Sequence, residues 1–149
     1  MSETETGTGT GTGTGSGAGT PVGEPAAPLD GALRLTREPD DDGWAVLRLD
    51  PQPVALSGQG DSAYVHGGAL ATCVDTASWE AVVVQQPGTW VVADLRVDFL
   101  RLARATPHRV RAQVRRMGRR QAVTDVEIAS WDDPARLVAV GRAMLTRVD

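Results

Sequence analysis

Several residue types are missing or scarce in this sequence, and each absence removes a class of protein. The chain contains no lysine, so all fifteen basic residues are arginine. Its one cysteine, Cys73, cannot form an internal disulfide, which fits a reducing cytoplasm. One Phe and one Tyr leave few aromatic rings to stack on bases, and the net charge of −4 also argues against nucleic-acid binding.

Long apolar runs are also missing. No stretch reaches the roughly 18 apolar residues that a membrane-spanning helix needs. The chain does not begin with a basic region followed by an apolar one, so no signal peptide is indicated. We therefore expect a cytoplasmic protein that does not insert into membranes.

The 149 residues divide into a low-complexity segment and a segment of domain size. Residues 1–28 are a Gly-Thr repeat that runs into a Pro-Ala segment, with almost nothing apolar to bury, which predicts a disordered tail. Residues 29–149 are long enough to bury a hydrophobic core and are expected to form one domain.

One long helix is predicted from Gly67 to about Gln85. Apolar residues recur there at helical spacing, and Gln86–Gly88 ends the pattern. Cys73 lies on the apolar face with no base beside it, which favours a core residue over a nucleophile. The predicted apolar face consists of Leu70, Cys73, Val74, Ala77, Ala81 and Val84.

Strands are predicted on both sides of this helix. One spans residues 43–50, and four with period-two alternation follow the helix within residues 89–103, 108–117, 121–131 and 136–148. Residues 31–39 are compatible with a short helix or an irregular lead-in, and residues 51–63 read as a loop. The pattern predicts an α+β fold in which the helix packs across one face of a four-strand antiparallel meander. One helix leaves sheet edges uncovered, so we expect a homodimer.

A single acidic residue, Asp75, interrupts the predicted apolar helix. The helix opens with Gly67 and Gly68, whose backbone a ligand can approach closely and whose N–H groups have no intrahelical partner. Such an end can stabilise an oxyanion, although composition alone favours the simpler interpretation that the glycines make a tight loop-to-helix entry. Asp75 is either a base in an apolar groove or a partly exposed residue bonded to Ser78 or Trp79.

The spacing of these groups bears on the choice. Asp75 follows Gly67 by eight residues, which is about 12 Å along a helix. One reacting carbonyl cannot easily touch both groups of the same helix. Two antiparallel copies would bring the helix start of one chain to the acid of the other.

Four segments in this order resemble the hotdog-fold acyl-CoA thioesterases of the phenylacetyl-CoA thioesterase (PaaI-like) type. They are "HGGALATCVDTA", "LRVDFLRLA", "VRRMGRRQAVTDVEI" and "RLVAVGRAML", and the similarity runs from Gly43 to Val148. The resemblance implies an antiparallel sheet wrapped around one long helix, dimers or tetramers, and sites at the dimer interface.

By this resemblance, the Gly67 N–H is the oxyanion donor and Asp75 of the other subunit is the nucleophile or general base. His66 would shape the loop, although a loop histidine more often bonds to backbone. The substrate would be an acyl-CoA or an acyl carrier protein thioester, with no metal and no bound cofactor. The rival interpretation is a protein that binds acyl thioesters without hydrolysing them.

Two polar positions of the family are replaced in this sequence. Gly60 stands where an Asn is common, and Val92 and Ala93 stand where a Ser or Thr is common. Gln59, Asp61 and Ser57 are candidates to substitute for these missing polar groups.

The remaining candidate binding residues each have a second interpretation. Gly68 and Trp79 would line the substrate site, although Trp79 is equally expected in the core. Arg119 and Arg120, in a larger arginine cluster, would bind the phosphates of CoA or form a solvated sheet face. His108 begins a strand and is expected at the surface.

Overall fold

The computed structural model describes residues 28–149, so the predicted tail lies outside the described residues except for Pro28. The helices are α1 (Pro28–Leu33) and α2 (Gly67–Gln85), with 3-10 turns η1 (Pro53–Ala55) and η2 (Gly60–Ser62). The strands are β1 (Leu35–Asp41), β2 (Trp44–Leu49), β3 (Leu56–Ser57), β4 (Tyr64–Val65), β5 (Trp90–Phe99), β6 (His108–Met117), β7 (Gln121–Ser130) and β8 (Leu137–Arg147).

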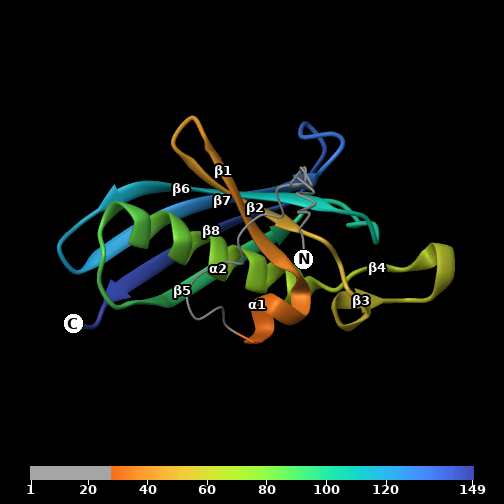
Figure 1. Ribbon diagram of the computed structural model, residues 1–149, viewed down its shortest axis with the longest axis horizontal. Helices are drawn as coiled ribbons and strands as arrows, with labels where there is room; N and C mark the ends of the chain where they lie inside the picture. The colour runs from red at the N-terminus through yellow and green to blue at the C-terminus, as the bar shows by residue number, and fades with distance from the viewer. Residues whose placement is uncertain (1–27) are drawn as a thin grey trace, which may run out of the picture.

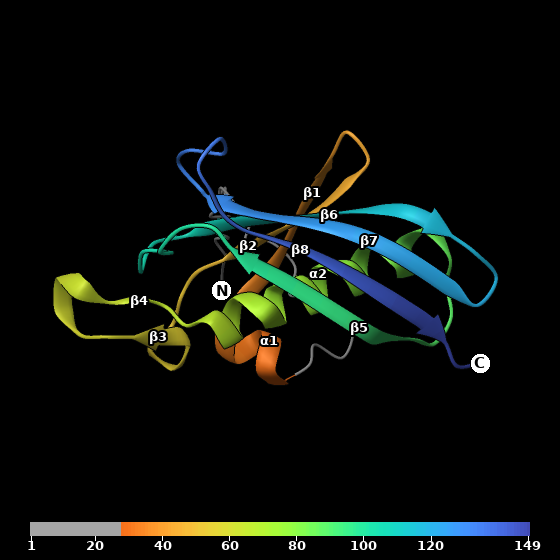
Figure 2. The same cartoon turned by 180° about the vertical axis from the view of Figure 1, so that it is seen from behind.

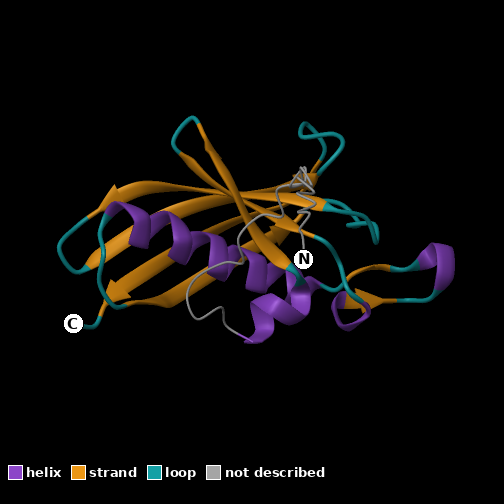
Figure 3. Ribbon diagram, viewed as in Figure 1, coloured by secondary structure: helices purple, strands orange, loops and turns teal. Residues whose placement is uncertain are grey.

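Six strands form one antiparallel sheet in the order β1-β2-β6-β7-β8-β5, and β3 and β4 form a separate hairpin. The long helix α2 lies across one face of the sheet, with α1 beside it (Figures 1 and 3). The view from behind shows the opposite face, with β5 at one edge (Figure 2). This arrangement confirms the predicted α+β fold with a single long helix packed on an antiparallel sheet.

The predicted four-strand meander is wrong in its order. Of the four strands after the helix, only β6, β7 and β8 follow one another as hairpins, whereas β5 pairs with β8 and β6 pairs with β2. Residues 100–107 carry the chain from one sheet edge, at β5, back to β6. Period-two alternation identifies strands but carries no information about which strands are neighbours.

The segment before β2 is more regular than predicted. It contains α1 and then β1, which pairs with β2 through a turn in which Asp42 and Gly43 both have positive φ. Asp-Gly at such a turn is a strong hairpin signal. The interior Pro39 obscures the strand in the sequence, and it is tolerated because β1 is an edge strand whose pairing is irregular between Glu38 and Asp41.

The buried face of α2 follows the predicted pattern with one exception. Leu70, Cys73, Val74, Ala77 and Ala81 are buried against the sheet, whereas Val84, predicted on the same face, is 60% exposed near the end of the helix. Pro87 lies two residues past the last helical residue and cannot continue the hydrogen-bonding pattern.

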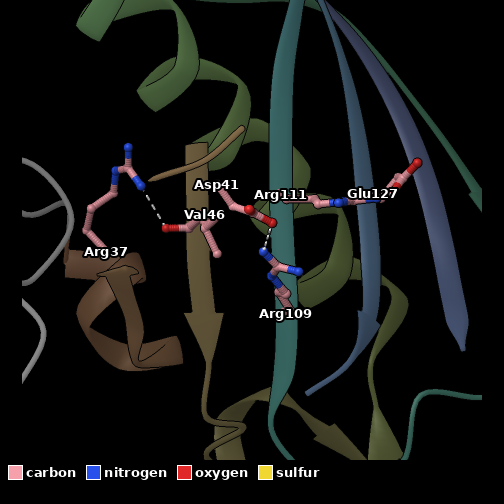
Figure 4. A network of polar contacts seen from close by, with 6 residues as sticks. All are labelled: Arg37, Asp41, Val46, Arg109, Arg111 and Glu127. Carbon is pink, nitrogen blue, oxygen red and sulfur yellow. Dashed lines mark hydrogen bonds and ion pairs between the residues drawn. The ribbon is translucent and has the colours of Figure 1, made fainter. Parts of the chain in front are cut away.

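The outer face of the sheet is covered by paired charges. Arg111 on β6 bonds to Glu127 on β7 at 2.6 Å, and Arg109 on β6 bonds to Asp41 of β1 at 2.6 Å (Figure 4). The two ion pairs match the predicted polar face, and they leave the opposite face to pack on α2. On the helix side, Arg37 of β1 lies 3.6 Å from Glu80 of α2 and donates to the Val46 carbonyl at 2.9 Å, which holds the edge strand to β2 (Figure 4).

Helix α2 packs closely on the sheet at Gly141 on β8. A Cβ at this position would lie 2.7 Å from Cγ1 and 2.8 Å from Cγ2 of Val74. It would also lie 3.2 Å from the Arg96 carbonyl on β5. Only glycine therefore allows helix and sheet to meet at this distance.

We expect Gly141→Ala to lower the free energy of unfolding by about 1–3 kcal/mol, because the added methyl group overlaps Val74. Urea unfolding measures the change. Gly31→Ala is the matched control, since a Cβ at Gly31 meets no atom within 4 Å. A Gly141→Ala protein that unfolds at the wild-type urea midpoint would contradict this account of the packing.

Candidate functional site

The first turn of α2 is organised by His66, which caps the helix. Its Nδ1 accepts a hydrogen bond from the Gly68 N–H at 2.9 Å, and its carbonyl accepts from the Ala69 and Leu70 N–H groups at 3.0 and 3.2 Å. A Cβ at Gly68 would lie 3.0 Å from His66 Nδ1, so the second glycine makes room for the capping ring. His66 thus bonds to backbone, which is the commoner role considered for it, and engages the Gly68 N–H.

The N–H of Gly67 differs from its neighbours. It has no hydrogen-bond acceptor among residues 28–149, whereas the next three N–H groups all have one. A Cβ at Gly67 would lie 3.2 Å from Cζ of Phe99, so the ring of this β5 residue stands against the start of the helix. The result is one free donor at the positive end of a 19-residue helix, beside an aromatic wall.

Asp75 lies on the exposed side of the same helix in the single subunit. Partial burial raises the pKa of its carboxyl group, and the negative charge of Asp30 raises it further. No hydrogen bond within the described chain joins Asp75 to Ser78 or Trp79, the two partners considered for a solvated role. Ser78 is instead buried and accepts from Thr124 Oγ1 at 2.8 Å.

Other nucleophiles and bases are less suited to reaction. Cys73 is fully buried, and burial raises the pKa of its thiol to about 12, so the thiolate is not available near neutral pH. His108 does begin β6, but its prediction as a surface residue is wrong, because the side chain is 1% exposed. It points to the helix side of the sheet, in register with the buried Val110, and burial lowers its pKa. Residues 28–149 hold no cluster of His, Cys, Asp and Glu side chains suited to a metal ion.

The structure does not bring all predicted site residues together within one subunit. Gln59 and Asp61 are exposed at the tip of the β3–β4 hairpin, which projects away from the sheet (Figure 1). Trp79 is partly buried and packs with Val82 and Trp90, as its core interpretation predicted. Arg119 and Arg120 lie in the β6–β7 turn, at the opposite end of α2 from Gly67 (Figures 1 and 2).

Three residues near the site were missed by sequence reasoning. Phe99 was assigned to a strand, but alternation alone could not show that its ring covers Gly67. Asp30 and Thr76 are joined by a hydrogen bond of 2.8 Å between α1 and α2, and Asp30 is 8% exposed. A buried acid 45 residues before Asp75 leaves no local pattern in the sequence, so only the tertiary fold reveals it.

No helix among the described residues is long and apolar enough to cross a membrane.

A search of curated proteins found no match to this chain. Solved structures do match. PaaI of the phenylacetic acid degradation operon of E. coli is 28% identical over 85% of this chain and 88% of its own, with a TM-score of 0.72.

Two further solved structures extend this similarity. A mutant of the phenylacetic acid degradation protein PaaI from Thermus thermophilus is 28% identical over 82% of this chain and 100% of its own, with a TM-score of 0.68. AziG of S. sahachiroi is 25% identical over 82% of this chain and 97% of its own, with a TM-score of 0.71. These neighbours confirm the predicted PaaI-like hotdog fold.

The family model of the thioesterase superfamily matches residues 63–145, which include β4, α2 and the four strands that follow. This segment contains the capped glycine pair, the free Gly67 N–H and Asp75. The chain belongs to the thioesterase superfamily and is a thioester hydrolase.

Proposed function

We propose that this protein hydrolyses an acyl-CoA to the free acid and CoA, in a homodimer whose two subunits together form each active site. The observation that carries the proposal is the Gly67 N–H, a helix-terminal donor without an acceptor among residues 28–149. It is positioned to hold the oxygen that becomes negative when a thioester carbonyl is attacked. Asp75 supplies the base or nucleophile.

The dimer is supported by the exposed edge of the sheet. β5 has ten residues and, within residues 28–149, pairs only with β8, so its other edge offers backbone groups that no described strand pairs with. Leu95 and Phe99 pair in register with the buried Ala143 and Ala139, which places both on the helix side of the sheet. They are nevertheless 36% and 56% exposed, which is unfavourable for apolar side chains unless a second subunit covers them.

A two-fold axis beside β5 would make the two edge strands and the two α2 helices antiparallel. Gly67 of one subunit would then face Asp75 of the other, which removes the separation of about 12 Å within one helix. The second subunit would also desolvate Asp75, which strengthens it as a base.

The chemical step follows from these placements. Asp75 takes a proton from water while the water oxygen bonds to the thioester carbon, and the carbonyl electron pair moves onto oxygen near the Gly67 N–H. Collapse of this intermediate breaks the C–S bond, and the thiolate leaves with the proton from Asp75. If Asp75 instead attacks the carbon itself, the C–S bond breaks, the CoA thiolate leaves and a mixed anhydride forms. Water then hydrolyses the anhydride to the free acid and regenerates Asp75.

The arginines at the β6–β7 turn also have a role in the proposed dimer. Arg116, Arg119 and Arg120 line an open hollow of about 580 Å³ at the β6–β7 turn. If Gly67 of the second subunit faces Asp75, the helix continues for ten residues, about 15 Å, toward this end of the molecule. The extended thiol arm of CoA would run along that path and leave its phosphates beside the guanidinium groups.

The first prediction from this proposal concerns catalysis. Wild-type protein should release thiol from at least one member of a panel of short, long and arylacetyl-CoA thioesters, and Asp75→Asn should reduce kcat/KM by about a hundredfold or more. The arylacetyl substrate is included because two similar structures are proteins of phenylacetic acid degradation.

Asp133→Asn, which removes the same charge from an exposed turn, serves as the control. Equal release by wild type and Asp75→Asn would remove Asp75 from the mechanism. Release only from an acyl carrier protein would change the substrate. Binding of the thioesters without any release would favour the rival, a non-catalytic binding protein.

The second prediction concerns assembly. Leu95→Asp should convert the dimer to monomer and abolish hydrolysis, because it places a charge in the proposed apolar contact along β5. Light scattering and the thiol assay measure the two effects. Val54→Asp, at a 70% exposed apolar residue of η1, should change neither. A fully active wild-type monomer would contradict the shared site.

The third prediction concerns the cost of Asp75 to stability. The pKa of Asp75 is higher in the folded state than in the unfolded state. At a pH between these two pKa values, the folded state still holds the proton and the unfolded state has lost it. Wild-type stability therefore falls as the pH rises through that range. Asp75→Asn, which lacks this titration, should melt at a higher temperature than wild type at pH 7, with a difference that shrinks as the pH falls below the unfolded value. A difference in melting temperature between the two proteins that stays the same at all pH values would contradict the raised pKa of Asp75.

A further inference from the structure

The short helix α1 places a buried carboxylate next to the proposed base. Asp30 is 8% exposed, and its Oδ1 accepts a hydrogen bond of 2.8 Å from Thr76 Oγ1, the residue that follows Asp75 on α2. No other hydrogen bond from a described residue reaches this carboxylate, and no described arginine forms an ion pair with it. Burying a carboxylate with one neutral partner is unfavourable, so the position of Asp30 is unusual for a residue that only packs.

Burial is the larger cause of the raised pKa of Asp75, and the negative charge of Asp30 is the second cause. Among described residues, Asp30 is the only charged group that shifts the pKa of Asp75. The Cys73 thiol on the preceding turn is neutral, and Glu80 further along α2 lies 3.6 Å from Arg37 of β1. The charged residues of β5 pair in register with outward-facing β8 residues, so they lie on the face of the sheet away from α2. They are Asp94, Arg96 and Asp98. The same outer face carries Arg111 of β6, Asp125 and Glu127 of β7, and Arg142 of β8. On β2, Arg48 is paired with Asp50 and stacks on Trp131.

We propose that Asp30 is a positioning residue of this active site: its carboxylate is held by Thr76, the residue next to Asp75 on α2, and makes Asp75 a stronger base toward water. This inference rests on the proposed role of Asp75 in hydrolysis. It also accounts for a site that has Gly60, Val92 and Ala93 where polar helpers were expected. The electrostatic support comes from α1, which lies before the segment that matches the family model.

The test compares wild type with Asp30→Asn, which keeps the shape and the acceptor oxygen for Thr76 but removes the charge. The acid limb of the pH profile of kcat/KM should move to lower pH, because Asp75 then loses its proton more easily. The limiting kcat at higher pH should fall by about threefold or more, because a weaker base accepts the proton from water less readily. KM should stay near the wild-type value, since Asp30 does not touch the substrate.

Thr76 provides a second, independent pair of variants. Thr76→Ser retains the hydroxyl donor and should reproduce the wild-type pH profile. Thr76→Val releases Asp30 and should move the acid limb in the same direction as Asp30→Asn. Asp133→Asn is the control for loss of one charge at a distance and should leave the profile unchanged. Melting temperatures of all variants separate these effects from unfolding of α1.

Carbon-13 NMR titration of the Asp75 carboxyl group, assigned with Asp75→Asn, makes the test independent of turnover. A titration midpoint that moves to lower pH in Asp30→Asn supports the coupling of the two carboxylates. An unchanged midpoint overturns it, whether or not the protein hydrolyses thioesters. If wild type releases no thiol from any substrate, the proposed function fails, and the titration still decides the relation of Asp30 to Asp75. An acid limb that stays in place in a folded, active Asp30→Asn protein also overturns the proposal.

Discussion

The close packing of α2 on the sheet at Gly141 is the constraint on which the rest of the molecule depends. Because Gly141 of β8 has no side chain, Val74 packs directly on the sheet backbone. The helix then lies close enough to the sheet for its small residues Ala77 and Ala81 to be buried. This depth also brings the start of the helix to the end of β5, where the Phe99 ring meets Gly67. The position of the free N–H therefore follows from the packing of the core.

The same packing leaves α2 with one side uncovered. The sheet buries one face and α1 covers part of another, so the residues beside β5 and around Asp75 stay exposed in the single subunit. Apolar residues on an unpaired sheet edge and a carboxylate with a raised pKa are both unfavourable for an isolated domain. A shared interface would bury the exposed apolar residues and would make the Asp75 carboxylate part of an active site. Assembly and catalysis are therefore linked in the proposed function.

Charge in this protein is sorted by sheet face. On the outer face, arginines lie opposite acids, as in Arg111 with Glu127 and in Asp125 with both Arg115 and Arg142. Exposed pairs of this kind contribute little stability individually, and their ordering matters more because it keeps the face solvated. The helix side carries few charges, and among the described residues the charge of Asp30 adds to burial in raising the pKa of Asp75.

The sequence by itself determined the local elements and supplied candidates for the reacting groups. The long helix is predicted by the spacing of Leu70, Cys73, Val74, Ala77 and Ala81, and the long strands are predicted by alternation. The Gly pair and Asp75 stand out as the proposed reacting groups, because each of these signals is a short-range pattern set by one helix turn or one strand pleat. Only the tertiary structure decided which strands are neighbours, that His108 is buried, that Phe99 covers Gly67, and that Asp30 lies beside Asp75. These are contacts between residues far apart in the chain, and they depend on how the whole core closes rather than on any local period.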